Sequence, residues 1–173
     1  PNAILDAVRI NELATANLNG LRDENNEAQD WVELFNTSSN AVSLAGWGLT
    51  DDEDEPTKWV FPAVSIAARG YLVIFCSGKD RKPITPGSRL HTNFKLSAGG
   101  EFLGLYNAET PRRLISSFPP YPNQRNNYSY GYDPQDQLRY FQTPSPGTAN
   151  GASTITGVVA ETKFSHQRGF YDV

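Results

Sequence analysis

Short runs of alternating apolar and polar positions recur along most of the chain and predict β-strands. The runs are rich in Val, Ile, Phe, Trp and Tyr and are bounded by Gly, Pro, Asn and Asp. Such boundaries are typical of turns. The predicted strands are residues 8–13, 30–36, 47–50, 58–61, 71–76, 101–106 and 114–118. Strands this short and this numerous favour an all-β fold, a β-sandwich of two packed sheets.

Helices and domain boundaries are predicted from the remaining segments. The best helical candidate, residues 25–29, is too short to be more than a turn. After Pro144-Ser145-Pro146-Gly147 the residues become small and polar, as in a linker. We therefore expect an N-terminal lead-in at 1–7, one sandwich at 8–150, and a linker with the first strand of a following module at 151–173. Because the chain opens at Pro1 and has no methionine, we expect it to be part of a longer protein.

Two strands carry informative patterns. Residues 71–76 are almost all apolar, which indicates a central strand covered on both faces, with Cys76 a small buried hydrophobe. In residues 30–36 alternation places Val32 and Leu34 on one face and Glu33 among aromatic residues on the other. We expect Glu33 either to form a cross-strand ion pair or to accept hydrogen bonds from loop amides.

Composition and charge narrow the classes of function. Hydrophobic residues make up 38% and charged residues 20% of the chain, which indicates a globular protein. The net charge of −4 makes nucleic acid an unexpected partner. The single cysteine excludes an intrachain disulfide and a cysteine zinc site. No apolar run approaches the ~18 residues of a membrane helix, so we expect no membrane insertion, and we expect a monomer.

Two acidic segments are candidates for a calcium site, because calcium takes six to eight oxygen ligands. The first is not an EF-hand, since Ala28 stands where the loop needs glycine and Leu34 where it needs glutamate. The alternative is that these side chains are solvated turn and cap residues. Calcium is thus the one candidate cofactor. The candidate ligands are Asp23, Asn25, Glu27, Asp30, Asp51, Asp52 and Asp54.

A tyrosine-rich segment at 119–132 is the candidate ligand-binding site. It combines tyrosines with amides and one arginine, the chemistry of stacking platforms for sugars or peptides. The alternative is a proline-rich loop followed by a strand whose tyrosines pack on the sheet. The candidate residues are Tyr121, Tyr128, Tyr130 and Tyr132.

Evidence for catalysis is weak. The sequence has no Gly-x-Ser-x-Gly motif, and its histidines are His91 and His166. We expect His91 to be structural. Paired carboxylates of a glycosidase need a rigid cleft, which a small sandwich seldom forms. We therefore expect no enzymatic activity.

An ordered series of sequence blocks resembles the lamin tail domain in its bacterial form, over roughly residues 8–150. The blocks are Ile10-Asn11-Glu12-Leu13, Asp30-Trp31-Val32-Glu33-Leu34-Phe35-Asn36, Leu44-Ala45-Gly46-Trp47-Gly48-Leu49-Thr50-Asp51-Asp52, Lys58-Trp59-Val60-Phe61-Pro62, Gly70-Tyr71-Leu72-Val73-Ile74-Phe75, Leu90-His91-Thr92-Asn93-Phe94-Lys95-Leu96-Ser97-Ala98-Gly99-Gly100-Glu101, Ser129-Tyr130-Gly131 and Thr143-Pro144-Ser145-Pro146-Gly147-Thr148-Ala149-Asn150. The resemblance implies an immunoglobulin-like β-sandwich. Such modules are not enzymes, and they occur in nuclear lamins and in large secreted or surface proteins of bacteria.

The last residues carry a second resemblance. Phe164-Ser165-His166-Gln167-Arg168-Gly169-Phe170-Tyr171-Asp172 is similar to the lead-in of a chitobiase-like C-terminal module. The two resemblances together imply an extracellular or cell-surface location, with other domains of the parent chain as partners.

Two functions remain open at this point. One is a non-catalytic spacer, adhesion or protein-interaction module of a large exported bacterial protein. The alternative is an accessory module that binds a polysaccharide or extracellular nucleic acid for a catalytic neighbour on the same chain. In either case a glycan or a protein is a candidate ligand.

Overall fold

The computed structural model describes residues 7–85 and 87–157. These residues form thirteen β-strands and contain no α-helix, and so no helix that could cross a membrane. The strands are β1 (Val8–Ala14), β2 (Trp31–Asn36), β3 (Val42–Ser43), β4 (Gly48–Thr50), β5 (Trp59–Val60), β6 (Ser65–Ile66), β7 (Tyr71–Phe75), β8 (Leu90–His91), β9 (Leu103–Tyr106), β10 (Leu114–Phe118), β11 (Ser129–Tyr132), β12 (Leu138–Phe141) and β13 (Thr154–Ile155).

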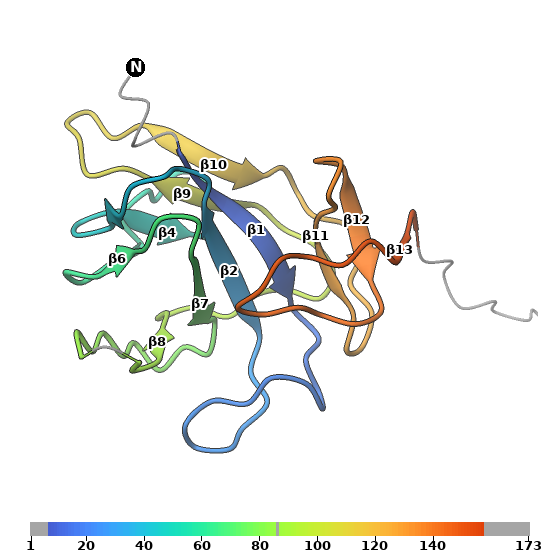
Figure 1. Ribbon diagram of the computed structural model, residues 1–173. Helices are drawn as coiled ribbons and strands as arrows, with labels where there is room; N and C mark the ends of the chain where they lie inside the picture. The colour runs from blue at the N-terminus through green and yellow to red at the C-terminus, as the bar shows by residue number, and fades with distance from the viewer. Residues whose placement is uncertain (1–6, 86, 158–173) are drawn as a thin grey trace, which may run out of the picture.

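The strands form a two-layer sandwich (Figure 1). One layer is a seven-stranded sheet in the order β13-β12-β11-β1-β2-β7-β8, antiparallel except for the β7–β8 pair. The other contains a four-stranded sheet, β10-β9-β4-β5, and the short β3-β6 pair. The strand β1 lies between β11 and β2, at the middle of the larger sheet. The all-β sandwich predicted from the sequence is confirmed.

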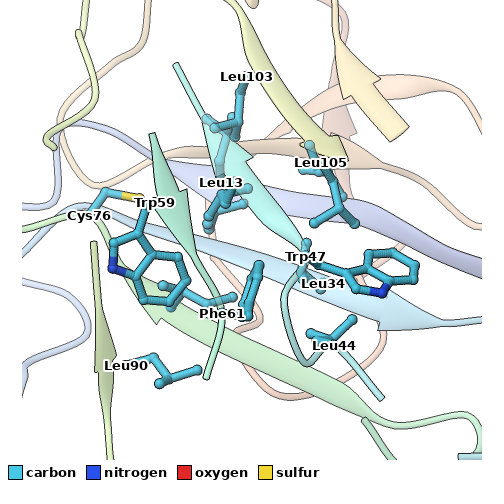
Figure 2. Close-up of a cluster of buried hydrophobic side chains, with 14 of the residues drawn as sticks. Leu13, Leu34, Leu44, Trp47, Trp59, Phe61, Cys76, Leu90, Leu103 and Leu105 are labelled. Atoms are coloured by element: carbon cyan, nitrogen blue, oxygen red, sulfur yellow. The ribbon is translucent and has the colours of Figure 1, made fainter. Parts of the chain in front are cut away.

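The main core lies between the layers and is built mainly from aliphatic and aromatic side chains (Figure 2). Leu13 of β1, Leu34 of β2 and Cys76, directly after β7, contribute to it. The burial of Leu34 is the one that alternation predicts. From the opposite layer the Trp59 and Phe61 rings meet edge to face, with centroids 4.7 Å apart. Cys76 is 1% exposed, and burial raises the pKa of its thiol, so the prediction of an inert buried hydrophobe is confirmed.

The outer face of the larger sheet carries a second, smaller apolar cluster. Ala14, Trp31 and Phe75 form it, and Leu21 and Val73 pack against it. These residues are buried although they lie on the side of the sheet away from the main core. Other parts of the chain therefore cover this face.

All seven predicted strands are present, and six further strands were missed. Four of these, β3, β6, β8 and β13, are only two residues long, too short for alternation to be visible. The predicted domain end at Asn150 is not a complete break, because Thr154 and Ile155 pair with Phe141 and Tyr140 of β12. The chitobiase-like segment, residues 164–172, lies outside the described residues.

One irregularity in β1 shapes the site described below. The register between β1 and β2 shifts between Ile10 and Glu12, so Asn11 is an extra, bulged residue. The shift places Glu12 directly opposite Glu33. Gly131 of β11 faces the bulge, and a Cβ there would lie 2.3 Å from the Asn11 carbonyl oxygen. Only glycine permits this close approach of the two strands.

Candidate functional site

A segment that follows β12 crosses the outer face of the larger sheet. We call residues 142–150 the strap. In Figure 1 it is the orange-to-red segment that passes in front of β1 and β2. Its hydrogen bonds to side chains of both strands confirm that it lies against them. The strap therefore joins the C-terminal part of the described chain to the middle of the sheet.

Two glutamates hold the strap. Glu12 and Glu33 are both 0% exposed and are cross-strand partners on the outer face of β1 and β2. Glu12 accepts hydrogen bonds from the Ser145 backbone N–H, at 3.2 Å to Oε1, and from the Ser129 hydroxyl, and its Oε2 lies 3.1 Å from Ser145 Oγ. Glu33 accepts from the Gly147 backbone N–H. The prediction that Glu33 caps loop amides is thus confirmed, and a cross-strand ion pair is not formed.

The bulged Asn11 and the last strap residue complete the attachment. The Asn11 side-chain amide donates to Glu33 Oε1 at 2.9 Å and to Asn150 Oδ1 at 3.1 Å. The Asn150 amide in turn donates to the Tyr132 carbonyl of β11 at 2.8 Å. We call Asn11, Glu12, Glu33 and their strap partners Ser145, Gly147 and Asn150 the glutamate clamp.

The clamp carries no compensating cation. Within residues 7–85 and 87–157 neither carboxylate forms an ion pair with a lysine or arginine. Burial raises the pKa of both carboxyls, and the nearby Glu12 raises that of Glu33 further, to about 8. Two adjacent buried carboxyls without a cation favour a state in which they hold a proton.

A second polar cluster ties the β1–β2 loop to the segment between β7 and β8. The Asp23 side chain is 0% exposed, and its Oδ2 faces the Lys79 ammonium. Its Oδ1 accepts hydrogen bonds from the backbone N–H groups of Asn25, at 2.9 Å, and Glu27, at 3.0 Å. Lys79 also pairs with Glu27, and Arg81 pairs with Glu24. We call Asp23, Glu24, Glu27, Lys79, Arg81 and His91 the ionic cluster.

His91 lies at the inner end of the ionic cluster. It is 0% exposed, with Nδ1 2.8 Å from Ser77 Oγ and Nε2 2.9 Å from Glu24 Oε2. Its ring stacks on Phe75, with centroids 5.2 Å apart. Hydrogen bonds hold the pKa of Glu24 down at about 2, although burial opposes this. Asp23, Glu24 and His91 could hold a metal by spacing alone, but Lys79 and Arg81 already neutralise the two carboxylates.

The seven calcium candidates lie in three places rather than around one centre. Asp23, Asn25 and Glu27 belong to the loop just described, where the Lys79 ammonium lies between the two carboxylates. Asp51 pairs with Lys58 at 2.7 Å. Asp52 accepts from the Asp54 backbone N–H at 3.0 Å, as a turn residue does.

Asp30 stands apart from both acidic groups. Its backbone carbonyl accepts from the Cys76 N–H at 2.7 Å as the chain enters β2. Burial raises the pKa of its carboxyl to about 6. The calcium hypothesis for these residues stays a prediction.

The tyrosine-rich segment does not form the exposed row that a stacking platform requires. Tyr121 is 2% exposed and donates hydrogen bonds to the Ser97 carbonyl and to Glu101, both at 3.0 Å. Its assignment to an exposed binding surface is therefore wrong, because its ring fills the main core. Tyr130 and Tyr132 belong to β11 and pack against Phe118, with ring centroids 6.0 and 5.7 Å away.

Arginine side chains cover two of the tyrosines. The Arg9 guanidinium lies over the Tyr132 ring at 4.7 Å, and the Arg125 guanidinium lies over Tyr128 at 5.4 Å. The alternative, a loop followed by a strand whose tyrosines pack on the sheet, describes the structure.

Fold and site together define the class of the protein: an immunoglobulin-like β-sandwich whose polar residues fasten loops to the sheet. The comparison with protein families makes the assignment specific. The lamin tail domain family matches residues 5–120, which is more than half of the chain, and the chain belongs to this family. The lamin tail domain is a non-catalytic, immunoglobulin-like fold family. No curated protein matches the chain.

Proposed function

We propose that this chain is a non-catalytic spacer, adhesion or protein-interaction module of a large exported or cell-surface bacterial protein, with other domains of the same chain as its partners. One observation supports the spacer function most directly. The described sandwich begins with the central strand β1, and its last part is attached to that same strand.

At the N-terminal side, the backbone hydrogen bonds of β1 attach the chain to the two neighbouring strands. The strand β1 pairs with β2 from Val8 to Ala14 and with β11 on its other side. A pull along β1 must shear both ladders at once, which requires many hydrogen bonds to break together. Central strands of this kind resist force better than strands that open one bond at a time.

The attachment at the C-terminal side is the glutamate clamp. The strand β13 is at the edge of the sheet and pairs through only Thr154 and Ile155. The strap behind it is bound to β1 and β2 by Ser145, Gly147 and Asn150. Tension arriving at residue 157 therefore passes through the clamp to the middle of the sheet.

Stretching the full chain between its two ends tests the proposal. We expect the unmodified chain to unfold in one cooperative step. The variant Glu33→Ala should add an earlier step at lower force, in which residues 142–157 are released with an extension of roughly 50 Å. An early release of that size in the unmodified chain would show that the strap carries no load, and would contradict the spacer function.

The exported location has its own test. Antibodies raised against the sandwich should bind intact cells of the source bacterium or detect the parent protein in the medium. Detection only after the cells are lysed would contradict it. The chitobiase-like resemblance of residues 164–172 stays a prediction.

A further inference from the structure

An uncharged cavity lies where the strap meets the β1–β2 loop. Its volume is about 420 Å³, within the range of small-molecule sites. Leu21, Trp31, Pro144 and Pro146 supply its apolar lining. Because Trp31 is only 1% exposed, its ring closes the floor and does not offer a stacking face.

The polar lining consists of amides and one hydroxyl. Asn19, Asn127, Gln142 and Thr143 line the cavity. Among the described residues no protein group bonds to the side chains of Asn19, Gln142 and Thr143. The Oδ1 atom of Asn127 accepts from the N–H groups of Leu18 at 3.0 Å and Asn19 at 2.8 Å, which leaves its amide hydrogens available. An amide both donates and accepts hydrogen bonds, and so does a hydroxyl.

The lining contains no charged residue, in contrast to the cavity of about 680 Å³ beside the ionic cluster, which Asp23, Glu24, Arg81, Lys82 and Arg89 line. An anionic ligand would lose its hydration here without gaining a counter-charge. The net charge of −4 also disfavours polyanions. The ligand that fits is uncharged and rich in hydroxyl groups.

A protein ligand fits less well. Protein interfaces depend on exposed Trp, Tyr or Arg anchors, and the one aromatic ring in this lining is buried. We propose that the cavity between the strap and the β1–β2 loop binds a residue of a neutral glycan through Asn19, Asn127, Gln142 and Thr143. Of the tyrosine-rich segment 119–132 the cavity lining contains Asn127 and none of the tyrosines, and the proposal does not depend on the spacer function.

Affinity electrophoresis of the full chain tests the site. Native gels contain dextran, galactomannan, xylan or mixed-linkage β-glucan as neutral probes, and alginate as an anionic one. We expect at least one neutral polysaccharide to retard the chain. The double variant Gln142→Ala/Thr143→Val should weaken that retardation about tenfold or more, since each lost hydrogen bond weakens binding several-fold.

The matched control is Gln135→Ala, which removes an exposed glutamine from the β11–β12 turn, outside the cavity lining. It should be retarded like the unmodified chain, and thermal melts should show that all variants are folded. Absence of retardation in every neutral gel would overturn the proposal. Retardation by alginate alone, or equal retardation of the double variant, would overturn it as well.

Discussion

Two loops are fastened to the same sheet by carboxylates, in opposite ways. In the ionic cluster, Asp23, Glu24 and Glu27 face Lys79 and Arg81, and the pKa of each carboxyl is lowered. In the glutamate clamp, Glu12 and Glu33 face only hydrogen-bond donors and each other, and their pKa values are raised. The carboxyl groups of the ionic cluster therefore hold the β1–β2 loop as anions. The carboxyl groups of the glutamate clamp hold the strap best when they keep a proton.

The difference predicts opposite responses to pH. A carboxyl whose pKa is raised on folding contributes stability below its unfolded pKa, and this is lost as the pH rises through its folded pKa. A carboxyl whose pKa is lowered contributes stability above its unfolded pKa, which is lost as the pH falls. The stability contributed by Glu33 is therefore lost as the pH rises from 4.5 to about 8. The stability contributed by Glu24 is lost as the pH falls from 4.5 to about 2.

The largest predicted effect is the loss of stability on the alkaline side. As the pH rises from 5 to 9, ionisation of the Glu33 carboxyl should lower the unfolding free energy by on the order of 4 kcal/mol. This corresponds to a fall in Tm of about 10 °C. The measurement is a series of urea or thermal unfolding curves at each pH.

The matched variant for this series is Glu33→Gln, which keeps an acceptor and a donor without a titrating group. It should be less dependent on pH, and at pH 9 more stable than the unmodified chain. Asp30, whose pKa is also raised, is present in both proteins, so their difference reports Glu33 together with its coupling to Glu12. Equal pH profiles for the two proteins would show that Glu33 does not hold a proton.

The next effect in size comes from removing the clamp acceptor altogether. The variant Glu33→Ala leaves the Gly147 N–H and one Asn11 amide hydrogen without their acceptor. At pH 6 this should lower the unfolding free energy by on the order of 3 kcal/mol. Asp136→Asn, which suits the left-handed backbone at this position (φ 56°) and removes the exposed charge that pairs with Arg9, serves as control and should cost less than about 1 kcal/mol.

Breaking the ionic cluster should cost less. Lys79→Ala removes the ammonium shared by Asp23 and Glu27, yet Asp23 keeps its two backbone donors. We expect a loss of about 1 kcal/mol that shrinks in 1 M salt. Denaturation at low and high salt measures it, with Lys82→Ala as control. If the clamp variant were the salt-sensitive one, the contrast between the two loops would be wrong.

The smallest predicted effect concerns calcium. Because Lys79 lies between Asp23 and Glu27 and Lys58 pairs with Asp51, we expect melts in millimolar calcium and in chelator to agree within about 1 °C. A calcium-dependent rise of about 5 to 10 °C would instead establish a site in the acidic segments.

The sequence predicted what depends on local pattern. Alternation placed Val32 and Leu34 in the main core and Glu33 on the outer face, and the near-continuous apolar run at β7 placed Cys76 among buried residues. The pairing of Glu33 with loop amides was also predictable, because a carboxylate among aromatic residues needs donors.

What the sequence did not predict depends on contacts between distant segments. Glu12 faces Glu33 only because Asn11 is bulged, and alternation alone places Glu12 on the same face as Ile10. Lys79 and Asp23 are separated by 56 residues, so their pairing has no local signal. The block Thr143–Asn150, with its glycine and two prolines, gave the one available hint of the strap.

The glutamate clamp is tested most directly by carboxyl-carbon NMR of the full chain with labelled glutamate, titrated from pH 3 to pH 10. Glu33→Gln and Glu12→Gln assign the two signals. We predict that the pair titrates with at least one apparent pKa near 8, while the Glu24 carboxyl, with a pKa of about 2, stays mostly ionised down to pH 3. Titration of both clamp glutamates at or below 4.5 would show that they are ordinary anions, and would contradict the account.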